Sequence, residues 1–158
     1  MDTEALKSLL SDFDLTKFVP ALDTVLGWIE MATRIAVMAG PVLMLGLGLI
    51  YLLAPPKEAN YRLGYRFWWS MASLDAWQFT HHIAGMVFTS LGMILTIVMS
   101  LICNGYRGMD AEAMLRSALR CIGWIIGLTV AACVAIDVVV VIVFDHKGFR
   151  RKDLAEQE

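Results

Sequence analysis

Three uninterrupted apolar runs limit this chain to a membrane fold. They cover residues 35–54, 83–103 and 121–144, and each supplies the roughly 20 helical residues that a bilayer core of about 30 Å requires. The runs explain why 58% of the 158 residues are apolar and why the mean hydropathy reaches +0.64, which is above the range of soluble domains. The sequence therefore predicts an all-α integral membrane protein with three transmembrane helices in one membrane domain, residues 35–144.

Residues 1–34 are expected to form an amphipathic N-terminal segment. Residues 2–14 place their apolar side chains on one helix face, and residues 18–29 do the same with Pro20 in the first turn. Neither piece is apolar enough to span, so we expect an interfacial helix that lies at the membrane surface and leads into the first span. The alternative is a helix that packs on other subunits or on the first loop. Glu30 and Arg34 are four residues apart and should pair.

Small residues and a proline inside the runs predict where the helices approach each other or deform. Pro41 leaves a carbonyl one turn earlier without its usual partner, so a kink or local unwinding is expected there. Gly46 and Gly48 allow close helix contact in the first run. The small residues near one face of the second run, as in a packing stripe, are Gly85, Gly92 and Ser100.

Asp137 is the single ionisable residue well inside an apolar run. A carboxylate at that depth is costly, so it should face the bundle interior, pair with a donor or carry a proton. The candidate partners, all in the segment that should share its membrane side, are Arg62, Arg66, His81 and His82. The alternative is an unpaired, locally hydrated aspartate near the interface.

The segment between the first two runs, residues 57–82, combines aromatic, charged and amide side chains and is predicted to be a loop. Its aromatic residues suit headgroup depth and could form an anchoring belt; they are Tyr61, Tyr65, Phe67, Trp68, Trp69 and Trp77. Asn60 and Gly64 next to Arg66 predict a tight turn whose arginine is aimed at a carboxylate or a phosphate. Two interpretations follow: a structural clamp on Asp75 or Asp137, or a recognition surface for a partner or lipid.

The histidines and cysteines do not indicate a metal or another cofactor. His81 and His82 are adjacent, and neighbouring side chains on a helix point about 100° apart, so His81 is interpreted as an interfacial hydrogen-bonding residue. Cys103 and Cys121 should lie on the same side of the membrane. They could form a disulfide if that side is oxidising, and otherwise they are inert thiols. No catalytic constellation is present in the sequence, so an enzyme is not expected, and neither is a nucleic-acid partner.

Basic residues near the spans favour one orientation in the cell membrane. The side with residues 57–82 and the tail, residues 145–158, carries seven: Lys57, Arg62, Arg66, Lys147, Arg150, Arg151 and Lys152. The other side carries six, and Lys7 among them is far from any span. The positive-inside rule then predicts an outside N-terminus, with the loop and the basic-then-acidic tail in the cytoplasm.

A family resemblance rests on the residues of this same loop. They are Asn60, Gly64, Tyr65, Arg66, Ser70 and Trp77, followed by an apolar helix with Gly85 and Gly92. This spacing resembles the signature of the SdpI family of small bacterial membrane proteins, which reads roughly Asn, Gly-Tyr-Arg-Thr, Ser, and Trp followed by Ala-Asn. Here Phe67 stands where Thr is usual, and Thr80-His81 stands where Ala-Asn is usual. The resemblance extends over residues 35–144.

The resemblance implies immunity to a secreted antimicrobial peptide, or membrane-anchored signalling through the cytoplasmic loop. The implied partners, besides the lipid bilayer, are a toxin peptide or a cytoplasmic regulator. The alternative is an accessory subunit that packs by its small-residue faces in a larger membrane complex, a transporter or a homo-oligomer.

Overall fold

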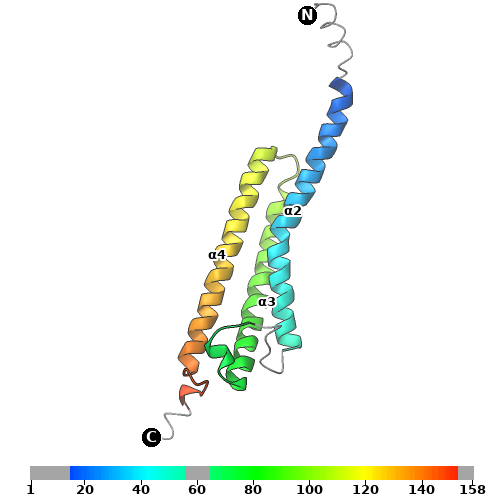
Figure 1. Ribbon diagram of the computed structural model, residues 1–158. Helices are drawn as coiled ribbons and strands as arrows, with labels where there is room; N and C mark the ends of the chain where they lie inside the picture. Colours follow the sequence, from blue (N-terminus) through cyan, green and yellow to red (C-terminus); the bar gives the residue numbers. More distant parts are fainter. Residues whose placement is uncertain (1–14, 56–64, 153–158) are drawn as a thin grey trace, which may run out of the picture.

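Three long helices and one short 3-10 turn make up the described part of the chain. The computed structural model describes residues 15–55 and 65–152, with side chains from residue 23 onward. The elements are α2, Leu15–Leu53; η1, Trp69–Met71; α3, Leu74–Asn104; and α4, Ala111–Val143. Helices α2 and α4 run in one direction and α3 runs in the other (Figure 1). Residues 65–73 and the turn that follows α4 therefore lie at the same end of the bundle.

The outer surface of the three long helices is suited to lipid. The segments Asp23–Leu53, Leu74–Asn104 and Ala111–Val143 are each long and apolar enough to cross a membrane, and at most 28% of the most apolar stretch of each is buried. Large apolar side chains such as Leu43 and Leu101 are 67% and 69% exposed. An apolar surface of this extent would be a liability in water. The structure confirms an all-α fold with three helices capable of spanning a membrane.

Helix α2 joins two segments that the sequence analysis separated. It is continuous from Leu15 to Leu53, so no helix end separates residues 15–34 from the first apolar run. Glu30 and Arg34 form the predicted ion pair just before the first apolar run. Residues 2–14 lie outside the described residues, so the interfacial helix remains a prediction. The helix also continues through Pro41, which is buried, and it bends along its length instead of unwinding (Figure 1).

Helix α3 begins earlier than the apolar run predicts, and this corrects the predicted loop 57–82. Its first residue is Leu74, because Ser73 caps the helix by accepting a hydrogen bond from the Ala76 backbone N–H at 3.1 Å. Trp77 and His81 therefore lie on a helix and not in a loop. Helix α4 also begins before its run, at Ala111, with Asp110 at the N-cap position and Glu112 in the first turn, where a negative charge is favourable.

Glycines let α2 and α3 approach backbone to backbone. A Cβ atom on Gly48 would lie 2.4 Å from the Thr89 backbone nitrogen, and one on Gly92 would lie 2.6 Å from that of Leu45. A Cβ atom on Gly85 would lie 2.9 Å from Cγ of Leu52 and 3.2 Å from the Leu52 backbone nitrogen. The predicted packing stripe is thus present at Gly85 and Gly92, whereas Ser100 is exposed.

The core along the bundle axis is formed by side chains from all three long helices. Its members include Val37, Met44, Tyr51, Leu95, Met99, Ile125, Ile136 and Val140. Cys103 and Cys121 belong to the same core, and both are buried free thiols. The structure therefore agrees with inert apolar thiols and not with a disulfide between Cys103 and Cys121.

Gly48 and Gly46 provide a matched test of the close α2–α3 contact. Gly48→Ala should lower the melting temperature in detergent, because its methyl group would overlap the α3 backbone and overpacking costs about 1–3 kcal/mol. Gly46→Ala is the control, since a Cβ there meets nothing within 4 Å and alanine favours a helix over glycine by about 1 kcal/mol. Equal melting temperatures for the two variants would contradict the contact.

Candidate functional site

Tyr65 connects the segment after α2 to both other helices. Its backbone N–H donates to Nε2 of His81 on α3 at 2.9 Å. Its hydroxyl reaches α4, where it lies 3.0 Å from the Cys133 carbonyl oxygen and 2.8 Å from Oδ1 of Asp137. A single residue at this end of the bundle therefore bonds α3 and α4 at once.

His81 is buried and uses both ring nitrogens. Its Nδ1 lies 2.8 Å from the Trp77 carbonyl oxygen, and because a carbonyl only accepts, Nδ1 carries the proton. Nε2 is then free to accept the Tyr65 N–H. His81 therefore lies inside the bundle and makes hydrogen bonds, as expected, whereas its position at the membrane interface stays a prediction.

Aromatic rings enclose the imidazole. The Trp77 ring centroid lies 4.2 Å from that of His81, and the Tyr51 ring meets it edge-on at 5.0 Å. Phe88 contacts both Tyr51 and Tyr65, with ring centroids 6.4 and 6.1 Å apart. Trp77 is fully buried, so it is a core residue and not part of the predicted aromatic belt. In this apolar setting an unpaired polar group is costly, which explains why the two His81 nitrogens are both bonded.

Asp137 is half-buried and finds a donor, as predicted, but the donor is Tyr65. Tyr65 was not among the predicted partners; of those, Arg62 lies outside the described residues, His82 is exposed and the His81 nitrogens bond elsewhere. Burial, and after it the hydrogen bond with Asp137, raises the pKa of Tyr65, so the phenol remains a donor at neutral pH. Its single proton can serve either Asp137 or the Cys133 carbonyl at a given moment.

Ser70 shapes the turn that precedes α3. The fully buried hydroxyl accepts from the Phe67 backbone N–H at 3.0 Å and donates to the Phe67 carbonyl at 2.8 Å. The Phe67 ring stacks on Trp69 with centroids 5.5 Å apart. Ser70 therefore has a structural role in this turn. Arg66 and Trp68, in the same turn, are exposed on the surface.

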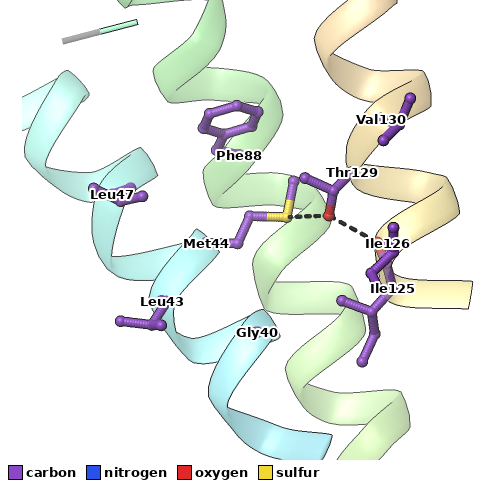
Figure 2. A pocket seen from close by; sticks show the side chains of 9 residues that line it. All are labelled: Gly40, Leu43, Met44, Leu47, Phe88, Ile125, Ile126, Thr129 and Val130. Atoms are coloured by element: carbon purple, nitrogen blue, oxygen red, sulfur yellow. Dashed lines mark hydrogen bonds between the residues drawn. The ribbon is translucent and has the colours of Figure 1, made fainter. Parts of the chain in front are cut away.

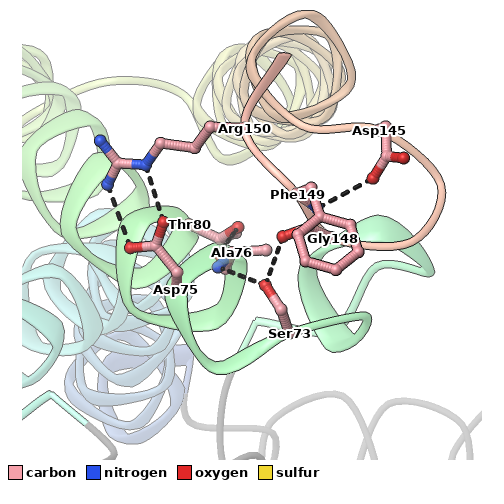
Figure 3. Close-up of polar contacts among 8 residues, drawn as sticks. All are labelled: Ser73, Asp75, Ala76, Thr80, Asp145, Gly148, Phe149 and Arg150. Atoms are coloured by element: carbon pink, nitrogen blue, oxygen red, sulfur yellow. Dashed lines mark hydrogen bonds and ion pairs between the residues drawn. The ribbon is translucent and has the colours of Figure 1, made fainter. Parts of the chain in front are cut away.

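The turn after α4 docks onto the start of α3 (Figure 3). The Ser73 hydroxyl donates to the Gly148 carbonyl at 2.7 Å, and Arg150 forms a two-pronged ion pair with Asp75 at 2.7 and 3.0 Å. Gly148 has φ +82°, and a Cβ on it would lie 2.7 Å from that of Ser73. We call residues 145–150 the C-terminal turn. The observed ion-pair partner of Asp75 is therefore Arg150, whereas the sequence predicted Arg66 as a partner of Asp75 or Asp137.

An apolar groove of about 360 Å³ opens between α2 and α4 (Figure 2). Its lining residues are Gly40, Leu43, Met44, Leu47, Phe88, Ile125, Ile126, Thr129 and Val130. The Thr129 hydroxyl, the polar side-chain group in this lining, donates to the Ile125 carbonyl at 2.7 Å. The wall therefore presents apolar atoms toward the bilayer, and it suits an acyl chain or the apolar face of a helix.

The structure brings together four of the predicted site residues. Tyr65, Trp77, His81 and Asp137 form one connected cluster, which we call the tyrosine cluster, and Ser70 supports the turn beside it. Arg66 is exposed at the same end. Asn60 and Gly64 lie outside the described residues. The Ser73–Gly148 contact was not predicted. The two residues are 75 positions apart, and neither stands in a sequence pattern that indicates a contact between them.

Comparison with known proteins gives one match. The model of the SdpI/YfhL protein family matches residues 57–144, which is more than half of the chain and includes the tyrosine cluster. No curated protein and no solved structure matches the chain.

The bond between Tyr65 and Asp137 can be tested by a double-mutant cycle. Tyr65→Phe should lower the free energy of unfolding in detergent by about 1–3 kcal/mol, because it leaves a half-buried carboxylate without its donor. Combined with Asp137→Val, its effect should shrink by at least about 0.5 kcal/mol. Thr96→Val removes a distant α3 hydroxyl, which bonds the Gly92 carbonyl, and should be additive with Tyr65→Phe. Additivity in both cycles would contradict the bond.

The docking of the C-terminal turn can be tested at two glycines with nearly the same positive φ. Gly148 and Gly108 have φ values of +82° and +81°, so alanine is strained at both, but a Cβ on Gly108 meets nothing within 4 Å. Gly148→Ala should raise hydrogen–deuterium exchange in residues 73–79 and 145–150, and Gly108→Ala should not. Unchanged exchange in Gly148→Ala would show that the turn does not depend on Ser73.

Proposed function

This chain belongs to the SdpI/YfhL protein family, and we propose that it protects the membrane of a bacterial cell against a secreted antimicrobial peptide. The observation that carries the proposal is the apolar groove between α2 and α4. A peptide that damages a bilayer must enter its apolar core, where it meets the groove directly. Binding there would withdraw the peptide from the lipid.

The tyrosine cluster connects the groove to the end of the bundle, so that peptide binding in the groove could change the structure there. Helix α4 forms one wall of the groove through Ile125, Ile126 and Thr129. On the same helix, Cys133 lies about one turn and Asp137 about two turns beyond Thr129, and the Tyr65 hydroxyl reaches both. A displacement of α4 by an occupant would therefore act on the segment that presents Arg66 and Trp68.

Signalling through that segment is the second function that we propose. Arg66 and Trp68 are exposed beside a buried, hydrogen-bonded turn, which is the arrangement of a preorganised binding surface. We place this end of the bundle in the cytoplasm on the count of basic residues. Its partner would then be a cytoplasmic regulator, or another membrane subunit if the chain acts as an accessory protein.

Protection is tested by challenging a sensitive bacterial strain, with and without the expressed chain, with a panel of secreted antimicrobial peptides. We expect the wild type to raise the inhibitory concentration of at least one peptide several-fold. Leu43→Trp should abolish most of that gain, because the larger side chain narrows the groove. Ile50→Trp is the matched control, since Ile50 is also exposed on α2 but does not line the groove, and it should protect like the wild type.

The outcomes separate the functions. Absence of protection by a well-expressed wild type would refute immunity for the peptides tested. Protection that is equal in the wild type, Leu43→Trp and Ile50→Trp would remove the groove from the proposal. Extraction in mild detergent and affinity purification then tests signalling or a subunit role: a discrete partner should co-purify with the wild type and be lost with Arg66→Ala.

A further inference from the structure

A second recess lies at the end of the bundle, between the 3-10 turn and the C-terminal turn. Its volume is about 460 Å³, and it is lined by Trp68, Met71, Ala72, His146 and Lys147. The apolar run of α4 ends immediately before it, at residue 144. The end of an apolar run marks the boundary of the hydrocarbon core, so the recess lies at the depth of the lipid headgroups.

The lining combines the two chemistries that a phospholipid presents at that depth. Trp68 is 79% exposed, and an exposed indole at the interface contacts both the acyl chains and the headgroup region. Lys147 and His146 are exposed on the opposite wall, and an ammonium group there can contact a phosphate. Among the described residues that line the recess, none is acidic.

The charges around the recess also favour an anion. In residues 65–75 and 145–152, five are basic, namely Arg66, Lys147, Arg150, Arg151 and Lys152, and two are acidic, Asp75 and Asp145; Asp137 on α4 accepts the hydrogen bond of Tyr65. Asp75 is paired with Arg150, and Asp145 accepts the backbone N–H groups of Lys147 and Phe149 at 2.9 and 2.8 Å. Both carboxylates are thus occupied within the fold.

We propose that this recess binds the phosphate of an anionic phospholipid, with Lys147 on the phosphate and Trp68 and Met71 against the glycerol and the upper acyl chain. A soluble anion would make no use of the apolar wall, which is why we assign the site to a lipid. The walls come from two segments that Ser73 and Gly148 hold together. Lipid binding would therefore also hold the C-terminal turn on α3.

Native mass spectrometry of the full chain, extracted from mixed vesicles of phosphatidylcholine with a minority of phosphatidylglycerol, tests the site. We expect the wild type to retain phosphatidylglycerol preferentially, and both Lys147→Gln and Trp68→Ala to reduce that retention several-fold. Lys147→Arg should keep it. Arg120→Gln is the control, because Arg120 is an exposed basic residue near the opposite end of α4.

Three results would overturn the proposal. The first is an absence of preference in the wild type. The second is an equal loss in Lys147→Gln and Arg120→Gln, which would mean diffuse attraction to charged lipid. The third is displacement of the lipid by millimolar inorganic phosphate, which would make the recess a site for a free anion. Trp68→Ala tests the apolar wall of the recess separately. Unchanged retention of phosphatidylglycerol in this variant would refute the assigned pose, even if Lys147→Gln reduces retention.

Discussion

The hydrogen bond between Tyr65 and Asp137 is the interaction on which this end of the molecule depends. A carboxylate on an apolar helix needs a donor, and here the donor comes from outside the three long helices. To reach it, the chain after α2 must fold inward, and this brings the Tyr65 backbone N–H onto His81. Burial of Trp77 and of the imidazole ring follows from the same approach. The polar residue in α4 thus determines where a segment 72 residues earlier in the sequence is placed.

The three helices are not packed with equal closeness, and the difference has a sequence origin. Glycines at three crossing points bring the α2 and α3 backbones together, whereas the α2 glycine that faces α4, Gly40, meets the Ile125 side chain. In a membrane, where lipid is as apolar as the side chains, close packing of this kind is what holds helices together. Helix α4 is correspondingly bordered by a groove, and the polar bonds at one end of the bundle attach it. The molecule is therefore a close helix pair with a third helix that packs on it through core side chains and is hydrogen-bonded to it at one end.

Much of the fold could be predicted from the sequence because the apolar runs are long and their periodicity is simple. The three helices, the glycine stripe on α3 and the pairing of Glu30 with Arg34 all follow from local spacing. The first residues of α3 and α4 were predicted too late. An apolar run begins only after the last polar residue, whereas a helix begins at its N-cap, which is itself polar. Ser73 moves that point nine residues ahead of the apolar run at residue 83. Tyr65, Trp77, His81 and Asp137 were singled out from the sequence, but their bonds were not, because spacing does not reveal that the Tyr65 hydroxyl reaches Asp137.

The hydroxyl of Ser73 caps α3 and also donates to the carbonyl of Gly148. The two functions of this one group come from parts of the chain that are synthesised at different times. The cap can form as soon as α3 enters the membrane, but the second bond must wait until α4 has crossed and the C-terminal turn has emerged. The bundle consequently closes at this end only after its last helix has been inserted. A chain with a misplaced α4 would keep its α3 cap but lack this closure, which distinguishes complete from incomplete insertion.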